Sequence, residues 1–188
     1  MPAKVCHMFI QILTERVQLN VLKLTPLQKS INCTLPTKGS KGIYMAKWTK
    51  KSFIEALKQE CKPHEVNVSM DFIQFSEAQA DIVAWGRGEG YGTMTFKVKS
   101  EDWGIVPIFH ITSDGKIKFL LNYMRKKVRK REILKEYTLK LESNFMMDFN
   151  EDVYNADIYF EIGELFVTKT EVDKLMHTVK GITARLHQ

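Results

Sequence analysis

The stretch that decides the fold is DIVAWGRGEGYGTMTFKVKSEDWGIVPIFHIT, from Asp81 to Thr112, which packs four glycines into seven residues. A loop that holds nucleotide phosphates lies between a strand and the amino end of a helix, whose NH groups and dipole bind the anion. Here the spacing is GxGxGxG without a GK[ST] ending, and a strand-like run follows. We therefore interpret the glycines as a β-hairpin connection. They are Gly86, Gly88, Gly90 and Gly92.

The segments around this hairpin predict an antiparallel sheet. Runs rich in Val, Ile, Phe and Tyr occupy residues 81–86, 92–99, 104–112 and 116–124, and glycine-bearing turns separate them. Residues 154–166 predict one further edge strand. We expect an α+β fold with a four- to five-stranded antiparallel sheet and helices packed mainly on one face.

Two helices are predicted before the sheet. The first runs from Thr49 to Gln59, with Ser52 and Glu55 as its capping pair. The second begins at Pro63, because proline suits the first turn of a helix.

Two more helices are predicted after the sheet. The first covers residues 131–142, and its apolar residues fall on one face. The last covers residues 170–186, with Thr168 and Glu171 as a capping box and an apolar stripe that we assign to the core.

Length, composition and cysteine content limit the class of protein. A chain of 188 residues fits one domain, and its net charge of +6 favours anionic partners. Three widely spaced cysteines indicate a reducing compartment, and no apolar run reaches the roughly 20 residues of a membrane span. We therefore expect a cytoplasmic protein that does not bind a membrane.

The chain divides near residue 44. Residues 25–42 contain two prolines and two glycines among many Ser, Thr, Asn and Lys residues, and they lack a sustained period. We expect residues 1–44 to form an amino-terminal extension and linker, and residues 45–188 to form a single α+β domain.

The order of these features resembles an uncharacterised α+β domain family of prokaryotic proteins. The resemblance is carried by Trp48 before a helix, Pro63 opening the next, AWGRGEGYGTMTF at 84–96 and VPIFHITSDGKIKFLLNYM at 106–124. It covers about residues 46–187 and implies two hairpins between helical pairs, without any assigned activity. Such sequences often have a proline-rich stretch after the last hairpin, where this chain has RKKVRKRE.

Catalytic patterns are weak. Asp81 followed by Asp114, Gly115 and Lys116 matches the acidic and lysine positions of a metal-dependent nuclease. The Asp-Gly pair is, however, a strong hairpin-turn signal, which predicts an exposed tip without a pocket. His110 lies in an apolar run, where a packed histidine is favoured over a general base. We assign no catalytic residues, metal ligands or cofactor, and the nuclease is our least favoured alternative.

The most informative cluster is YMRKKVRKRE, where six of seven consecutive residues are basic. We place it where the last predicted strand ends and a helix begins, so that the helix dipole opposes the charge unless an anion such as phosphate binds. We call the cluster the basic turn. It comprises Tyr123, Arg125, Lys126, Lys127, Arg129, Lys130 and Arg131.

The basic turn supports more than one interpretation. Our first choice is a non-enzymatic binding module that contacts nucleic-acid phosphates, and the alternative is a protein-interaction module that binds an acidic partner. Six acidic residues between Asp148 and Glu164 could instead fold against the basic turn, or the turn could be a solvated face. Trp85, Tyr91 and Trp103 near the turns could stack on bases or pack internally. We expect the basic side chains to be exposed and dispensable for folding.

Overall fold

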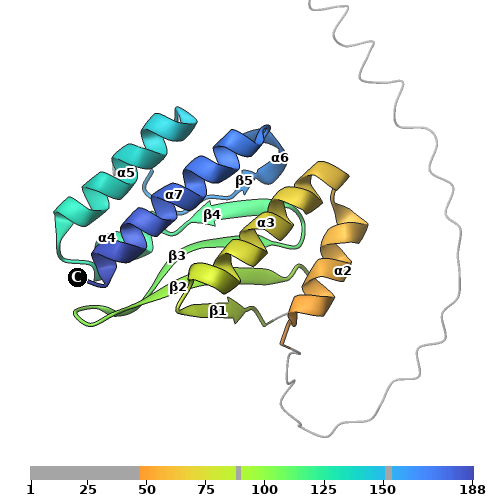
Figure 1. Ribbon diagram of the computed structural model, residues 1–188, viewed down its shortest axis with the longest axis horizontal. Helices are drawn as coiled ribbons and strands as arrows, with labels where there is room; N and C mark the ends of the chain where they lie inside the picture. The colour runs from red at the N-terminus through yellow and green to blue at the C-terminus, as the bar shows by residue number, and fades with distance from the viewer. Residues whose placement is uncertain (1–46, 88–89, 151–153) are drawn as a thin grey trace, which may run out of the picture. The chain divides into compact units, whose positions relative to one another are not determined.

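A computed structural model describes residues 47–87, 90–150 and 154–188. These residues form a mixed α+β fold with one five-stranded antiparallel sheet, as predicted (Figure 1). The extension and linker predicted over residues 1–44 lie outside the described residues, as does Gly88.

The sheet is a meander in which each strand pairs with the next in the order β1-β2-β3-β4-β5. The last strand, β5, has only two residues. Two of the described helices separate β4 from β5 in the sequence, and β5 then pairs with β4 at the edge of the sheet. This confirms the predicted edge strand. The strands are β1 (Ile82–Trp85), β2 (Thr93–Ser100), β3 (Gly104–Thr112), β4 (Lys116–Phe119) and β5 (Phe160–Glu161).

The glycine run joins β1 to β2, which confirms the hairpin interpretation. Gly86 donates a backbone hydrogen bond to Thr93 O at 2.8 Å, and Gly90 has a φ of 91°, a conformation that side chains disfavour. Gly92 lies under the Trp48 ring, because a Cβ atom there would be only 2.7 Å from Trp48 Cε3. The glycines thus allow a tight turn and a close aromatic contact.

The helices before the sheet form where predicted, with one difference in capping. In α2 (Lys50–Glu60), Thr49 caps the helix reciprocally with Ser52, so the predicted pairing of Ser52 with Glu55 was wrong. The capping residue reaches the backbone three positions later, and that position is Ser52. The second helix, α3, spans Pro63–Gln79 and has Pro63 in its first turn.

The helices after the sheet complete the core. In α5 (Arg131–Phe145) the apolar face is buried, and α7 (Lys169–Leu186) has the predicted Thr168–Glu171 capping box. Short helix α6 (Ile162–Leu165) follows β5. Figure 1 shows α3 and α7 crossing the same face of the sheet, with α5 alongside α7.

The strand predicted over residues 116–124 was too long. It ends at Phe119, and residues Leu121–Lys127 form the helix α4. Leu121, Met124 and Val128 are buried on one side, at the spacing of a helix. An unbroken apolar run does not by itself distinguish a strand from a buried helix, which explains the error.

Alternation along the strands divides the sheet into two different faces. In β2 the side chains of Met94, Phe96 and Val98 are fully buried, whereas the residues between them are only partly covered. On the buried face, Phe96 and Phe109 stack at 5.3 Å, and Phe75 of α3 stacks on Phe96 at 5.7 Å. The opposite face carries no such aromatic layer of helical side chains among the described residues.

Substituting Gly92 by alanine tests the contact with Trp48. We expect the added methyl group to lower the free energy of unfolding by about 1–3 kcal/mol, because the aromatic rings must move away. Gly181→Ala is the matched control. Gly181 lies inside α7, and a Cβ atom there would be 3.5 Å from Lys140 Nζ, an ordinary contact. We expect this substitution to raise the free energy of unfolding by about 0.5–1 kcal/mol, because alanine favours a helix more than glycine does. Urea denaturation of both variants measures the difference, and equal effects of the two substitutions would contradict this packing.

Candidate functional site

The basic turn spans the end of α4, the link to α5 and the first residue of α5. Arg125, Lys126 and Lys127 lie in the last turn of α4, and Arg131 begins α5. Positive charge at the carboxyl end of a helix interacts favourably with the helix dipole. The predicted unfavourable interaction with a helix dipole was therefore wrong for these three residues. Within the basic turn it applies near Arg131, at the amino end of α5.

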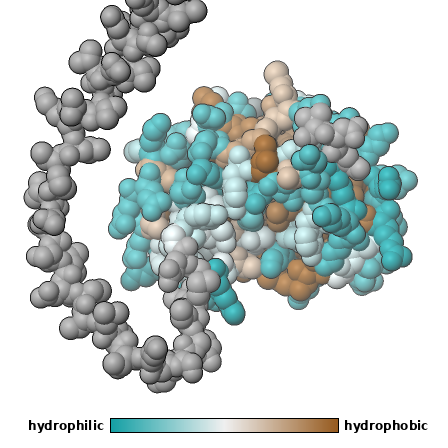
Figure 2. Space-filling view, turned by 180° about the vertical axis from the view of Figure 1, so that it is seen from behind, coloured by the Kyte–Doolittle hydropathy of each residue, from teal (hydrophilic) through white to brown (hydrophobic). Residues whose placement is uncertain are grey.

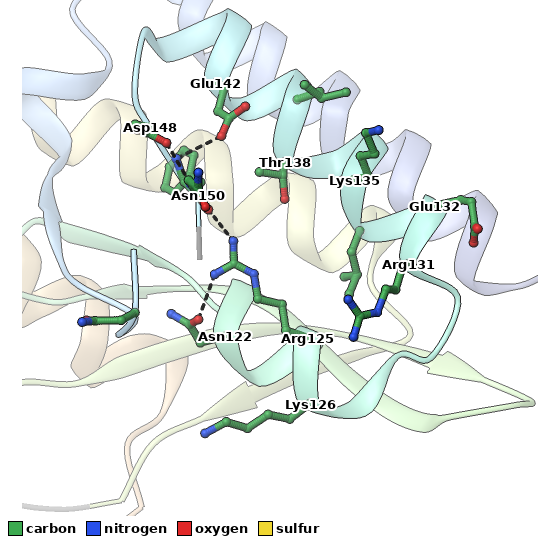
Figure 3. A pocket seen from close by; sticks show the side chains of 14 residues that line it. Asn122, Arg125, Lys126, Arg131, Glu132, Lys135, Thr138, Glu142, Asp148 and Asn150 are labelled. Carbon is green, nitrogen blue, oxygen red and sulfur yellow. Dashed lines mark hydrogen bonds between the residues drawn. The ribbon is translucent and has the colours of Figure 1, made fainter. Parts of the chain in front are cut away.

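Arg125 is half-buried and holds the fold together locally. Its guanidinium donates to Asn122 Oδ1 at 2.9 Å and to the carbonyl oxygen of Tyr154 at 3.0 Å, and it also donates to the carbonyl oxygen of Phe149 (Figure 3). These acceptors come from α4 and from the segment before β5. The expectation that the basic side chains are exposed was therefore wrong for Arg125, and its hydrogen bonds indicate a structural role.

The acidic segment from residue 148 to 164 does pack against α4. Besides the carbonyl groups that bind Arg125, it supplies Asp157, whose Oδ1 accepts from the backbone N–H of Asn122 at 2.9 Å. A carboxylate is favoured at this amino end of α4, where N–H groups lack partners. Glu151 and Asp152 lie outside the described residues.

One side of the basic turn borders a groove between α4, α5 and the acidic segment. The groove has a volume of about 1140 Å³, and Figure 3 shows its polar side chains. Side chains of both charges line it. Its charged members include Lys126, Arg131, Lys135, Glu132, Glu142 and Asp148.

The other side of the basic turn forms a hollow with a different character. Lys127, Arg129 and Lys130 line it together with Asp102 and Trp103 from the β2–β3 turn, around a volume of about 560 Å³. We call these five residues the basic hollow. It has three cations, one carboxylate and one indole ring, so its net charge is positive.

Contacts within and beside the basic hollow position its cations. Lys130 Nζ lies 5.4 Å from the Trp103 ring centroid and 3.6 Å from Asp102 Oδ2. Lys127 Nζ donates to the carbonyl oxygen of Ile105 at 2.7 Å and lies 3.5 Å from the hydroxyl of Tyr123. Tyr123 is 45% exposed, so its ring remains accessible next to Lys127. The structure thus brings Tyr123 and Trp103 to three of the six predicted basic residues.

Sequence reasoning missed the grouping of Trp103 with these cations. Residues 103 and 130 are far apart in the chain, and they meet because the β2–β3 turn and the α4–α5 link lie at the same end of the sheet. The strand register could have shown part of this grouping. Ser100 pairs with Gly104, so the residues between them, Trp103 included, form the turn at this end of the sheet.

The proposed nuclease pair is not brought together. Asp81 lies at the start of β1, where it accepts from Lys99 N at 2.7 Å and from His187 at 2.8 Å. Asp114 lies in the β3–β4 turn and pairs with Lys116 at 2.8 Å. The register places these positions at opposite ends of the sheet, so the two carboxylates cannot share a metal ion.

His110 is a packed side chain, as predicted. Its Nε2 lies 3.0 Å from the hydroxyl of Tyr159, and the residue is partly buried. Burial, followed by repulsion from Lys118, lowers the pKa of His110 to about 4, so the imidazole is neutral near pH 7. Within the described ranges, His, Cys, Asp and Glu side chains do not gather in threes as metal ligands would.

Comparison with known proteins adds no relative. We found no match among family models, curated proteins or solved structures. The part of the chain that the structure describes has no helix with the length and apolar character needed to cross a membrane.

Truncation of Arg125 tests its structural role. We expect Arg125→Ala to lower the free energy of unfolding by about 2 kcal/mol or more, because hydrogen bonds from a charged donor are lost and partly buried acceptors remain. Lys126→Ala, in the same helical turn but exposed, is the control and should change stability by less than about 0.5 kcal/mol. Chemical denaturation distinguishes the two. An Arg125 variant as stable as the Lys126 variant would contradict the structural assignment.

Proposed function

We propose that this protein is a non-enzymatic module that binds nucleic-acid phosphates through the basic hollow and the adjoining residues of the basic turn. The observation that carries the proposal is that Lys127, Arg129 and Lys130 line one hollow together with Trp103, with Lys130 Nζ 5.4 Å from the ring centroid. Ammonium and guanidinium groups bind phosphate oxygens, and a base can stack on an aromatic ring such as that of Trp103, which is partly buried, or of Tyr123, which is 45% exposed.

The roles within the basic turn follow from its contacts. Arg125 is committed to the carbonyl groups of the neighbouring segment, and we assign it no direct contact with the ligand. Arg129 is exposed and makes no ion pair with a described residue, so it can turn toward a phosphate without losing a partner. Lys130 pairs with Asp102 where both side chains are 56% exposed, and such pairs contribute little stability.

The mixed groove on the other side of the turn is a weaker candidate for a polyanion. Lys126, Arg131 and Lys135 share it with three acidic side chains, which would repel phosphate groups. An acidic protein partner remains the alternative ligand of the basic turn. Such a partner would use the cations alone, whereas a nucleic acid could also stack a base on Trp103.

The proposal predicts salt-dependent binding of labelled oligonucleotides. We expect log K to fall with log[salt] at a slope of roughly −2 to −5, since each phosphate contact contributes about 0.7 for a single strand and 0.9 for a duplex. A triple variant with Lys127, Arg129 and Lys130 changed to alanine should lose most of the affinity and about two units of the single-strand slope. Fluorescence anisotropy at several salt concentrations measures both quantities.

A control of equal charge separates a site from general attraction. Lys51 and Lys58 on α2 and Lys169 on α7 are exposed, and replacing them by alanine removes the same three charges. This control should keep at least half the affinity, and both triple variants should keep the far-UV circular dichroism and melting temperature of the parent. Equal losses in the two triple variants, or no binding by the parent at low salt, would overturn the proposal.

A further inference from the structure

The face of the sheet opposite α3 and α7, which the described helices leave uncovered, has its own chemistry. Register sets its members, because residues directly opposite each other in antiparallel strands point to the same side. Thr95 pairs with His110, and His110 pairs with Lys118, so the three side chains form one row across β2, β3 and β4. Figure 2 views the molecule from behind relative to Figure 1, and the surface seen there has large hydrophilic areas with smaller hydrophobic patches between them.

Lysines concentrate on this face. Lys97 and Lys99 alternate with the buried Phe96, Val98 and Ser100 along β2 and therefore point away from the helices. Together with Lys118 they form a group that we call the sheet lysines. Within the described ranges, none of the three ammonium groups lies within 4.0 Å of a carboxylate oxygen.

Aromatic rings lie beside the sheet lysines. Tyr159 packs over the His110 ring with centroids 5.4 Å apart, and Lys118 Nζ lies 3.9 Å from the Tyr159 centroid. Tyr91, from the glycine hairpin, meets the edge of Tyr159 with the ring centroids 6.4 Å apart. Tyr91 is 48% exposed, so one side of this aromatic group is open to solvent.

The basic hollow adjoins the same face. Lys127 Nζ donates to the carbonyl oxygen of Ile105, and Ile105 pairs directly with Lys99 on β2. Ile105 is itself 46% exposed. Cations and aromatic rings therefore continue from Trp103 and Lys127 at one end of β3 toward His110, Tyr159 and Tyr91 at the other, and among these rings that of Tyr91 is exposed.

We propose that the uncovered sheet face binds a single-stranded nucleic acid, with the sheet lysines on its phosphates and Tyr91 stacked on a base. This inference rests on one part of the proposed function, namely that the ligand is a nucleic acid, and it extends the path of that ligand beyond the basic hollow. A single strand exposes its bases for stacking, whereas a duplex keeps them paired inside. The accessible ring and the spread of cations along β2, β3 and β4 thus favour a single strand over a duplex.

Other occupants of this face fit less well. An anionic lipid surface would attract the sheet lysines, but peripheral membrane binding also uses apolar side chains buried at the interface. Polar Thr95 and the hydrogen-bonded His110–Tyr159 pair lie at the middle of this face instead. A single strand uses both the charges and the rings, so vesicle binding serves as an outcome of the test.

The experiment measures anisotropy of the full chain with labelled single strands of roughly 12 nucleotides, oligo(dT) and oligo(rU), a length within known single-strand sites. A duplex of equal length and vesicles containing anionic phospholipid are the comparison ligands. Tyr91→Ala should weaken single-strand binding about tenfold and leave duplex binding unchanged, whereas Tyr91→Phe, which retains the ring, should bind within about twofold of the parent. Because Tyr91 is 48% exposed, we expect both variants to keep the melting temperature of the parent, and thermal melting curves check this.

A second variant tests the charges. Changing Lys97, Lys99 and Lys118 to glutamine should reduce the single-strand salt slope by about two units, since each contact contributes about 0.7. If only the Lys127, Arg129 and Lys130 variant loses binding, the sheet face is not used and the proposed function stands. If only the sheet variants lose binding, the basic hollow is not the site and the sheet inference stands. Equal binding of duplex and single strand, or vesicle binding without oligonucleotide binding, would overturn the sheet inference.

Discussion

Among the described residues, helices pack on one face of the sheet, and that one-sided burial governs the rest of the fold. Phe72 and Phe75 of α3 reach down to Phe109 and Phe96 with ring centroids 6.2 and 5.7 Å apart, and each buried aromatic side chain contributes about 1.5–3 kcal/mol. Because strand side chains alternate, every core position in β2 fixes its neighbour on the opposite face. Lysines can occupy that opposite face without the cost of burying a charge. The same pattern that builds the core therefore builds a cationic surface.

The basic turn divides its charges between structure and surface. Arg125 joins α4 to the segment before β5 through the carbonyl groups of Phe149 and Tyr154, and Asp157 caps the other end of the same helix. On the same helix, Lys127 Nζ donates to the carbonyl oxygen of Ile105 at 2.7 Å. Trp103 then meets Lys130 from the neighbouring turn. One arginine thus supports the arrangement in which other cations remain available to a ligand.

Local sequence signals predicted most of the fold. Alternation found β2 and β3, the glycine run marked the hairpin, and Thr168 with Glu171 marked the start of α7, because each of these depends on neighbouring residues. Helix α4 was missed because its apolar run fits two kinds of structure until Leu121 and Met124 find their packing partners.

The candidate site was predicted less completely for a related reason. The cluster of cations is visible in the chain, but the commitment of Arg125 depends on carbonyl groups more than 20 residues away. The meeting of Trp103 with Lys130 and of Tyr91 with Tyr159 likewise depends on tertiary structure. Period two alone does place Lys97 and Lys99 on the face opposite the core, so the sheet lysines were available to sequence reasoning.

The central claim is that the surface left by one-sided burial is the ligand surface, and a chemical-shift titration tests it most directly. The protein labelled with nitrogen-15 is titrated with a single-stranded oligonucleotide at low salt, and the amide and indole signals are followed. We predict the largest changes at Lys97, Lys99, Lys118, Arg129 and the Trp103 indole. Changes confined to α2 or to the groove beside Lys135, or no changes at all, would contradict the account.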